Sequence, residues 1–256
     1  MRAKKAFGQN FLQDAVVVSQ IVAALDLSDS DSVIEIGPGQ GVLTKELLDT
    51  GANIVAVEID AEMIPLLNAR FPRSDRFRLV NADILVTDLT EFTGSYAGRS
   101  KIVGNLPYYI STAILQKIAS ERDLFSHCVF MLQREVVERI MAAPGSSDRG
   151  YLTVIMDSAF EIERLFDVSP DSFRPRPKVW SSVIALKPKP VNSDRDRHLL
   201  QLAGLAFAQK RKTILNNLKP HIENARCLLD AANIDERRRA ETLTLDEWYR
   251  LLEAMR

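Results

Sequence analysis

The sequence predicts an α/β fold: a parallel sheet with helices on both faces, followed by a small all-helical C-terminal domain. Short apolar runs rich in β-branched residues alternate with segments of helical periodicity through the first two thirds of the 256 residues. Such alternation is typical of βαβ units. No strand signal follows a Lys/Pro-rich linker at residues 187–191. Because single cores stop growing near ~250 residues, we expect two domains, at residues 1–188 and 192–256.

The expected elements follow from these patterns in order along the chain. Strands are expected at residues 32–37, 53–59, 76–82, 100–106 and 127–132. Helices connect them at residues 41–51, 61–71 and 111–120, where apolar residues recur every three or four positions. Two later runs, 161–168 and 181–187, are separated by a proline-rich loop and predict a closing hairpin. The C-terminal helices are expected at residues 196–218, 225–234 and 244–256.

The composition limits the possible partners and compartments. The formal net charge is −1, so a nucleic-acid partner would need local basic patches. Cys128 and Cys227 are distant in sequence and indicate a reducing, cytoplasmic environment. The histidines lack ligand spacing, so no metal site is expected. No apolar run reaches the ~18 residues of a membrane span, and we expect a monomer.

A glycine-rich stretch follows the first expected strand. In "VIEIGPGQGVLT", Gly37, Gly39 and Gly41 lie between this strand and the next helix. Glycines there allow a sharp turn and close approach of a ligand to the backbone and the helix N-terminus. A tight turn without a ligand is the alternative. The spacing G-x-G-x-G differs from the dinucleotide fingerprint, and no P-loop lysine follows.

Acidic residues end the next two expected strands. Glu58, in "IVAVEID", is placed to accept hydrogen bonds from both hydroxyls of a ribose. Asp83, in "NADIL", is placed to accept from an adenine amino group. Open α/β sheets bind ligands at the carboxyl edge of their strands. Together with the glycines, these residues therefore predict a nucleoside-containing cofactor.

The fourth expected strand ends in "GNLPYY", residues 104–109. Asn105 and the carbonyl of Leu106 can accept hydrogen bonds from an exocyclic amino group, Pro107 stiffens the turn and Tyr108 offers a stacking face. Two acceptors out of the ring plane favour a pyramidal nitrogen and stabilise the positive charge that develops as it attacks a sulfonium methyl group. The motif therefore predicts methylation of a base amine. A strand-ending turn with core aromatics is the alternative.

Seven segments resemble the ribosomal RNA adenine N6,N6-dimethyltransferases that use S-adenosylmethionine. They extend over residues 7–218 in the order and spacing of that family, and they are "FGQNFL", "EIGPGQGVLT", "VEID", "NADIL", "GNLPYYIST", "FRPRPKVWSSV" and "FAQKRKTILNNL". The resemblance implies a Rossmann-like methyltransferase domain and a helical C-terminal domain, with small-subunit ribosomal RNA, in a pre-30S particle, bound across both.

The resemblance also implies roles for individual residues. Asn10 and Leu12 would lie near the methionine part of S-adenosylmethionine, and Gly37 would be the close-approach glycine, beside Gly39. Phe173 would stack on the target adenine opposite Tyr108; its alternative is to pack inward in a rigid loop. The expected ligands of the cofactor include Asn105 besides Glu58 and Asp83. Tyr109 departs from the family, many of whose members carry Asn there.

Basic residues in three clusters are expected to contact RNA phosphates, although such clusters are often only solvated surfaces. They are Lys4, Lys5, Arg174, Arg176, Lys178, Lys210, Arg211 and Lys212. If residues 207–218 form one helix, Arg211 falls inside its apolar face. A buried arginine needs a partner, so Arg211 either pairs with an acid or marks a groove open to phosphate.

Three other functions are less consistent with the sequence. Large-subunit adenine methylases that confer macrolide resistance share the catalytic turn but lack a segment like "FAQKRKTILNNL". A ribosome-assembly factor without catalysis would not need the cofactor acids and "NLPY". A nicotinamide-dependent oxidoreductase is disfavoured by the glycine spacing. The sequence therefore predicts an enzyme that dimethylates adenine N6 and contributes to ribosome biogenesis.

Overall fold

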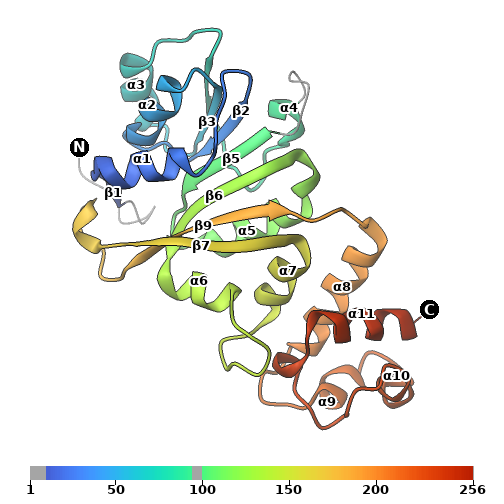
Figure 1. Ribbon diagram of the computed structural model, residues 1–256. Helices are drawn as coiled ribbons and strands as arrows, with labels where there is room; N and C mark the ends of the chain where they lie inside the picture. The colour runs from blue at the N-terminus through green and yellow to red at the C-terminus, as the bar shows by residue number, and fades with distance from the viewer. Residues whose placement is uncertain (1–9, 94–99, 256) are drawn as a thin grey trace. The chain divides into compact units, whose positions relative to one another are not determined.

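A computed structural model describes residues 10–93 and 100–255, and contacts divide the chain into two units (Figure 1). The first unit comprises Met1–Val137 and Glu161–Pro188, and the second comprises Glu138–Phe160 and Lys189–Arg256. The second unit thus includes a segment inside the range 1–188 that we assigned to one domain. This segment holds α7 (Tyr151–Ala159), whose Val154 is fully buried in the apolar cluster of the C-terminal helices.

A seven-stranded sheet in the order β4-β3-β2-β5-β6-β9-β7 forms the first unit. The five strands from β4 to β6 are parallel, and β9 is antiparallel to β6. The strands are β2 (Ser32–Ile36), β3 (Asn53–Glu58), β4 (Phe77–Asn81), β5 (Ser100–Asn105), β6 (Phe125–Gln133), β7 (Phe160–Val168) and β9 (Ser181–Pro188). The expected strands and the adjacency of the last two are confirmed.

Helices pack on the sheet because its strands are apolar on both sides. One cluster joins the odd-numbered residues Val33, Val103 and Val129 to the helices α1 (Ala15–Ala23), α2 (Val42–Asp49) and α3 (Met63–Arg70). Successive strand residues point to opposite faces of the sheet. The buried side chains of Ile34 and Ile102 therefore lie on the face opposite to this cluster. The remaining helical segments of this unit are α4 (Thr90–Thr93), α5 (Ser111–Ser120), the start of α6 (Arg134–Ile140), η2 (Arg122–Leu124) and η3 (Pro170–Ser172).

Besides α4, α6 and α7, two further features were not expected from the sequence. The first is α1, whose "AVVVSQIVA" is rich in β-branched residues; the Asp14 side chain caps it by accepting the N–H groups of Val16 and Val17. The second is a small antiparallel pair, β1 (Phe11–Leu12) with β8 (Phe173–Arg174), in which Leu12 lies opposite Phe173. This pair brings the N-terminal segment to the loop between β7 and β9.

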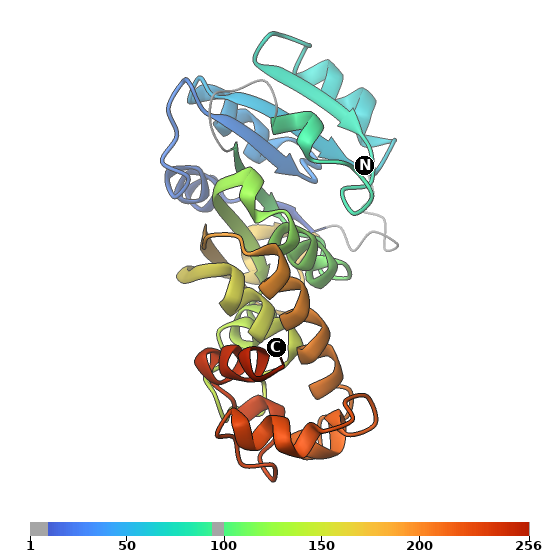
Figure 2. The ribbon, with the colours of Figure 1, turned by 90° about the vertical axis from the view of Figure 1, so that its right-hand side faces the viewer.

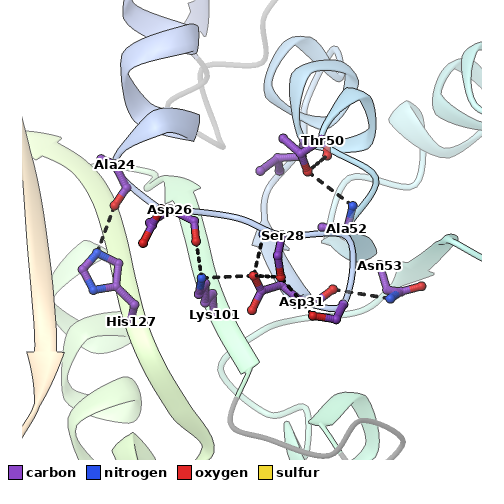
Figure 3. A network of polar contacts seen from close by, with 11 residues as sticks. Ala24, Asp26, Ser28, Asp31, Thr50, Ala52, Asn53, Lys101 and His127 are labelled. Carbon is purple, nitrogen blue, oxygen red and sulfur yellow. Dashed lines mark hydrogen bonds and ion pairs between the residues drawn. The ribbon is translucent and has the colours of Figure 1, made fainter.

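A polar network fixes the amino-terminal edge of the sheet (Figure 3). Lys101 in β5 donates to the Asp26 carbonyl at 2.6 Å and to the Asp31 carboxylate at 3.2 Å. The ring of His127 in β6 is hydrogen-bonded to the Ala24 carbonyl at 3.1 Å, and Asn53 at the start of β3 donates its backbone N–H to the Asp31 carbonyl. The loop from α1 to β2 is thereby tied to three strands.

The second unit is helical (Figure 2). Its core surrounds Trp248, which is fully buried and stacks on Phe207 with ring centroids 5.9 Å apart. Besides α7, its elements are the end of α6, α8 (Ser193–Ala206), α9 (Ile214–Leu218), α10 (Ala225–Ala231), η4 (Ala240–Thr242) and α11 (Leu245–Ala254). Within the described residues, no helix combines the length and apolarity that crossing a bilayer requires.

The prediction of one continuous helix at residues 196–218 is wrong, because the helix is interrupted in the middle of this range. The α8 helix ends at Ala206, α9 begins at Ile214, and the turn between them holds Arg211, which is exposed. The break is stabilised by Asn217, whose amide donates to the carbonyls of Ala206 and Gln209 at 2.6 and 3.1 Å. Arg211 is therefore not the buried arginine that a continuous helix would produce.

Candidate active site

The glycine loop connects β2 to α2 in a conformation that requires glycine. Gly37, Gly39 and Gly41 have φ angles of 64°, 54° and 73°, in the left-handed region that other residues rarely adopt. A Cβ on Gly41 would collide with the Phe71 ring, and one on Gly39 would lie 3.2 Å from the ring of Phe11. The backbone of this loop therefore stays close to the edge of the sheet.

Glu58 ends β3 and is held by two backbone groups. Its Oε2 accepts the N–H of Gly39 at 3.0 Å, and its Oε1 accepts the N–H of Asp60 at 2.8 Å. The side chain is 4% exposed, and burial raises the pKa of Glu58 although the two N–H groups oppose this. A carboxylate offers about four acceptor positions, so Glu58 can also accept hydrogen bonds from a ligand.

Asp83 lies after β4, at the same edge of the sheet as Glu58. Its Oδ1 accepts the N–H of Leu85 at 2.9 Å, which fixes the direction of the carboxylate. Because β2 to β5 are parallel, their carboxyl ends meet at this edge. The expected positions of the two acids relative to the glycine loop follow directly from this arrangement.

Residues 105–108 form the turn that ends β5. Asn105 donates its side-chain amide to the Asn10 carbonyl at 3.1 Å, which directs the other end of the amide, its oxygen, away from Asn10. Leu106 is buried, and its N–H donates to the Met131 carbonyl. The hydroxyl of Tyr108 is hydrogen-bonded to Ser181 at 2.9 Å, and burial raises the pKa of Tyr108.

One cavity brings the cofactor and turn residues together. It holds about 1110 Å³ of empty space, including its open mouth, and it lies entirely within the first unit. Apolar side chains such as Ile36, Val57 and Ile84 line most of its wall. The expected site residues that line it are Asn10, Leu12, Gly37, Gly39, Glu58, Asp83, Asn105, Leu106, Pro107 and Tyr108. An apolar cavity with a few polar groups is typical of a small-molecule site.

Phe173 differs from the expectation. Its side chain is fully buried in the core of the first unit, opposite Leu12 in the β1–β8 pair, and it lies outside the lining of the cavity. The ring therefore presents no open face to a base in this structure, and the inward-packed alternative describes it. Pairing with β1 explains the burial, and nothing in the sequence of the loop itself indicated that pairing.

The expected RNA-binding residues are at the surface where they are described. Arg174, Arg176 and Lys178 are exposed on the loop between β7 and β9, and Arg176 forms an ion pair with Asp171 at 3.2 Å. Lys210, Arg211 and Lys212 are exposed on the turn between α8 and α9. Lys4 and Lys5 lie outside the described residues.

Several residues at the site were not expected. Glu35, a carboxyl between apolar residues of β2, lines the cavity and accepts the Thr44 hydroxyl at 2.6 Å. Its position between isoleucines in "SVIEIG" was the available signal. Ser181 contacts Tyr108 from β9, and no local pattern indicated this. Tyr109 also lines the cavity and is 53% exposed.

Comparisons with known proteins show the family to which the chain belongs. The chain matches the family model "Ribosomal RNA adenine dimethylase" over residues 1–256. It is 45% identical to the ribosomal RNA small subunit methyltransferase A of Laribacter hongkongensis, over 97% of this chain and 94% of that protein. It is 40% identical to the protein of the same name from Pseudomonas aeruginosa, over 98% and 93% of the two chains.

Two solved structures have the same fold over nearly the whole chain. A dimethyladenosine transferase from Plasmodium falciparum has a TM-score of 0.78 and 26% identity, over 95% of this chain and 96% of that chain. The 23S rRNA methyltransferase ErmE has a TM-score of 0.70 and 25% identity, over 96% and 99%. The sequence identity of this chain to the two small-subunit methyltransferases is thus much higher than its identity to this large-subunit enzyme. The chain belongs to the ribosomal RNA adenine dimethylase family.

Proposed function

We propose that this protein transfers two methyl groups from S-adenosylmethionine to N6 of adenines in small-subunit ribosomal RNA, giving N6,N6-dimethyladenosine. The observation that carries the proposal is the meeting of two carboxylates and the Asn105–Tyr108 turn in one cavity. The names and identities of the relatives support the choice of RNA.

The cavity fits the cofactor on its adenosine side. Glu58 is fixed by the N–H groups of Gly39 and Asp60 and retains lone pairs for ribose hydroxyls. Asp83 is fixed by the N–H of Leu85 and is assigned to the adenine amino group. Apolar lining residues next to the two acids in sequence, such as Val57 and Ile84, suit the faces of a purine. Asn10 and Leu12, which flank Phe11 beside the glycine loop, are assigned to the methionine part.

The turn orients the amino group to be methylated. Asn105, held by the Asn10 carbonyl, and the carbonyl of Leu106 accept its two hydrogens, while Tyr108 stacks on the adenine and Pro107 keeps the turn rigid. When bound, S-adenosylmethionine would supply an electrophilic methyl group: the N–C bond would form as the S–C bond breaks to leave a neutral thioether, and the positively charged nitrogen would then release one proton to solvent. Preorganised acceptors stabilise the positive charge that develops on that nitrogen.

RNA binding is assigned to the exposed basic residues Arg174, Arg176 and Lys178 and to those at 210–212, with Lys4 and Lys5 added from the sequence. We assign the chemistry to a domain at residues 1–188 and RNA selection to the helical residues 192–256. The proposed substrate is a pre-30S particle in the cytoplasm, and the enzyme acts as a monomer with a role in ribosome biogenesis.

The product and the roles of the residues are tested together. Small subunits that lack the modification, incubated with S-adenosylmethionine and digested to nucleosides, should contain dimethyladenosine, while large subunits should not. Glu58→Ala and Asp83→Ala should raise the Kd for the cofactor about 10- to 100-fold, as loss of a charge-assisted hydrogen bond does. Asn105→Ala should keep binding within a few-fold and lower the single-turnover rate about 100-fold.

Two results would contradict the proposal. Monomethyladenosine as the only product at long times would refute the dimethylase reaction. An equal loss of cofactor affinity in all three variants would refute the division of roles between the acids and Asn105.

A further inference from the structure

Two adjacent tyrosines at the end of β5 face different parts of the cavity. Tyr108 is hydrogen-bonded to Ser181 at the start of β9. Tyr109 lines the cavity, and its pKa is raised by partial burial and by the negative charges of Asp83 and Glu58. In the sheet, β9 lies on one side of β5, and β3 and β4 lie on the other. The Tyr108 hydroxyl thus reaches β9, whereas Tyr109 lines the cavity together with Glu58 at the end of β3 and Asp83 after β4.

The turn explains why neighbours in sequence separate in this way. The N–H of Ile110 donates to the Pro107 carbonyl at 3.2 Å, so Tyr108 and Tyr109 are the two central residues of a turn. The Ser111 hydroxyl, at the start of α5, donates to the Tyr108 carbonyl. Both residues are therefore held between a buried strand and a helix, and the positions of their side chains follow from the backbone.

The surroundings of Tyr109 match one kind of ligand. Tyr109 is 53% exposed, and Ile59, also at the cavity, is 40% exposed. An uncovered aromatic ring and an uncovered aliphatic side chain thus lie beside two carboxylates that accept hydrogen bonds. A purine nucleoside has apolar faces together with amino and hydroxyl donors, and aromatic side chains bind bases through stacking.

We propose that Tyr109 packs against the adenosyl group of the bound cofactor, so that the two tyrosines serve different substrates: Tyr108 the target adenine and Tyr109 the cofactor. This rests on the proposed assignment of Glu58 and Asp83 to adenosine. Tyr109 is then a cofactor-contacting residue that determines how tightly the adenosyl group is held.

Isothermal titration calorimetry without RNA tests the proposal. Tyr109→Ala should raise the Kd for S-adenosylhomocysteine about tenfold, a loss within the range of one stacking contact. Tyr109→Phe keeps the ring and should stay within about twofold of the unaltered protein. 5′-Methylthioadenosine, which retains the adenosyl group but lacks the amino-acid part, should lose affinity by the same factor. Trp180→Ala is a matched control, because Trp180 is similarly exposed at 48% but lies outside the cavity lining.

Three outcomes would overturn the proposal. Unchanged affinity of Tyr109→Ala for both ligands would exclude a cofactor contact. Unchanged affinity with a slower single-turnover rate would assign Tyr109 to the target adenine. A loss for S-adenosylhomocysteine but not for methylthioadenosine would place the contact at the amino-acid part. If neither Tyr109→Ala nor Glu58→Ala changed the affinity for S-adenosylhomocysteine, the proposed cofactor site itself would be refuted. If Glu58→Ala lowered this affinity and Tyr109→Ala did not, only the role of Tyr109 would be refuted.

Discussion

Glu35 is a carboxyl group in the core of the first unit. It is 1% exposed, in a strand whose other residues are apolar or small, and its Oε2 accepts the hydroxyl of Thr44 at 2.6 Å. Burial raises the pKa of Glu35 to about 8, with a further contribution from the charge of Glu58, while the hydrogen bond from Thr44 opposes the change. Near neutral pH the folded protein therefore holds Glu35 mostly protonated.

This makes stability depend on pH in a defined direction. Between the ordinary pKa of 4.5 and about 8, the unfolded chain ionises Glu35 and the folded protein retains the proton. The free energy of unfolding should therefore fall as pH rises through this range, at up to about 1.4 kcal/mol per pH unit. Glu35→Gln keeps an acceptor for Thr44 and removes the titration, so the stability of the variant relative to the parent should increase with pH.

Urea unfolding at several pH values from about 5.5 to about 8.5, which span most of the range between the two pKa values, measures the difference. Glu91→Gln is the control, because Glu91 is exposed on α4 and its substitution should leave the pH profile of the parent unchanged. Parallel profiles for Glu35→Gln and the parent would show that Glu35 does not titrate in this range.

At the scale of elements, local patterns identified the strands of the seven-stranded sheet and most of the helices. They did not indicate α4, α6 or α7, and they failed at α1, where β-branched residues mask a helix that Asp14 caps and the sheet buries. They also failed at the break between α8 and α9. There, apolar spacing continued through the turn, but Asn217 in α9 donates to the carbonyls of Ala206 and Gln209. Tertiary hydrogen bonds outweighed the local preference for a longer helix.

Asn217 should therefore be structural. Asn217→Asp removes both amide donors at a site that is 4% exposed and should destabilise the protein by about 1–3 kcal/mol, the cost of leaving buried polar groups unpaired. Asn216→Asp is the matched control, since Asn216 is the exposed neighbour on the same helix. Urea unfolding should separate the two variants, and equal stabilities would refute the capping role.

At the scale of the whole molecule, RNA binding must come from local charge, because the net charge is only −1. Reversal of Lys210, Arg211 and Lys212 to Glu should weaken binding to small subunits and flatten its salt dependence. The slope of log K against log salt should decrease in magnitude by about 0.7–0.9 for each phosphate that the protein no longer neutralises. Filter binding at several salt concentrations measures this slope, and calorimetry should show unchanged cofactor affinity.

A second triple reversal separates this effect from a general change of charge. Lys45, Lys187 and Arg197 are exposed and already face acidic residues on the surface. Their reversal changes the net charge equally and should alter the salt slope much less. Equal slopes for the two triple variants would mean that the turn between α8 and α9 makes no specific phosphate contacts.

The sequence by itself determined where the parallel strands lie and which residues follow them. Since parallel strands end at one edge, this placed Gly37, Glu58, Asp83 and Asn105 at a common site before any contact was known. Each of these positions depends on a motif a few residues long, which local propensity and spacing can reveal.

The tertiary structure alone decided the features that depend on contacts between distant segments. Phe173 is buried because β8 pairs with β1, which lies near the other end of the first unit's sequence, as the hydrogen bond between Ser172 and Asp14 also indicates. Tyr109 remains half exposed in the cavity with Asp83 and Glu58, whereas the adjacent Tyr108 is hydrogen-bonded to Ser181 of the distant strand β9. Burial and orientation are properties of packing, and a stretch of sequence contains only one side of each contact.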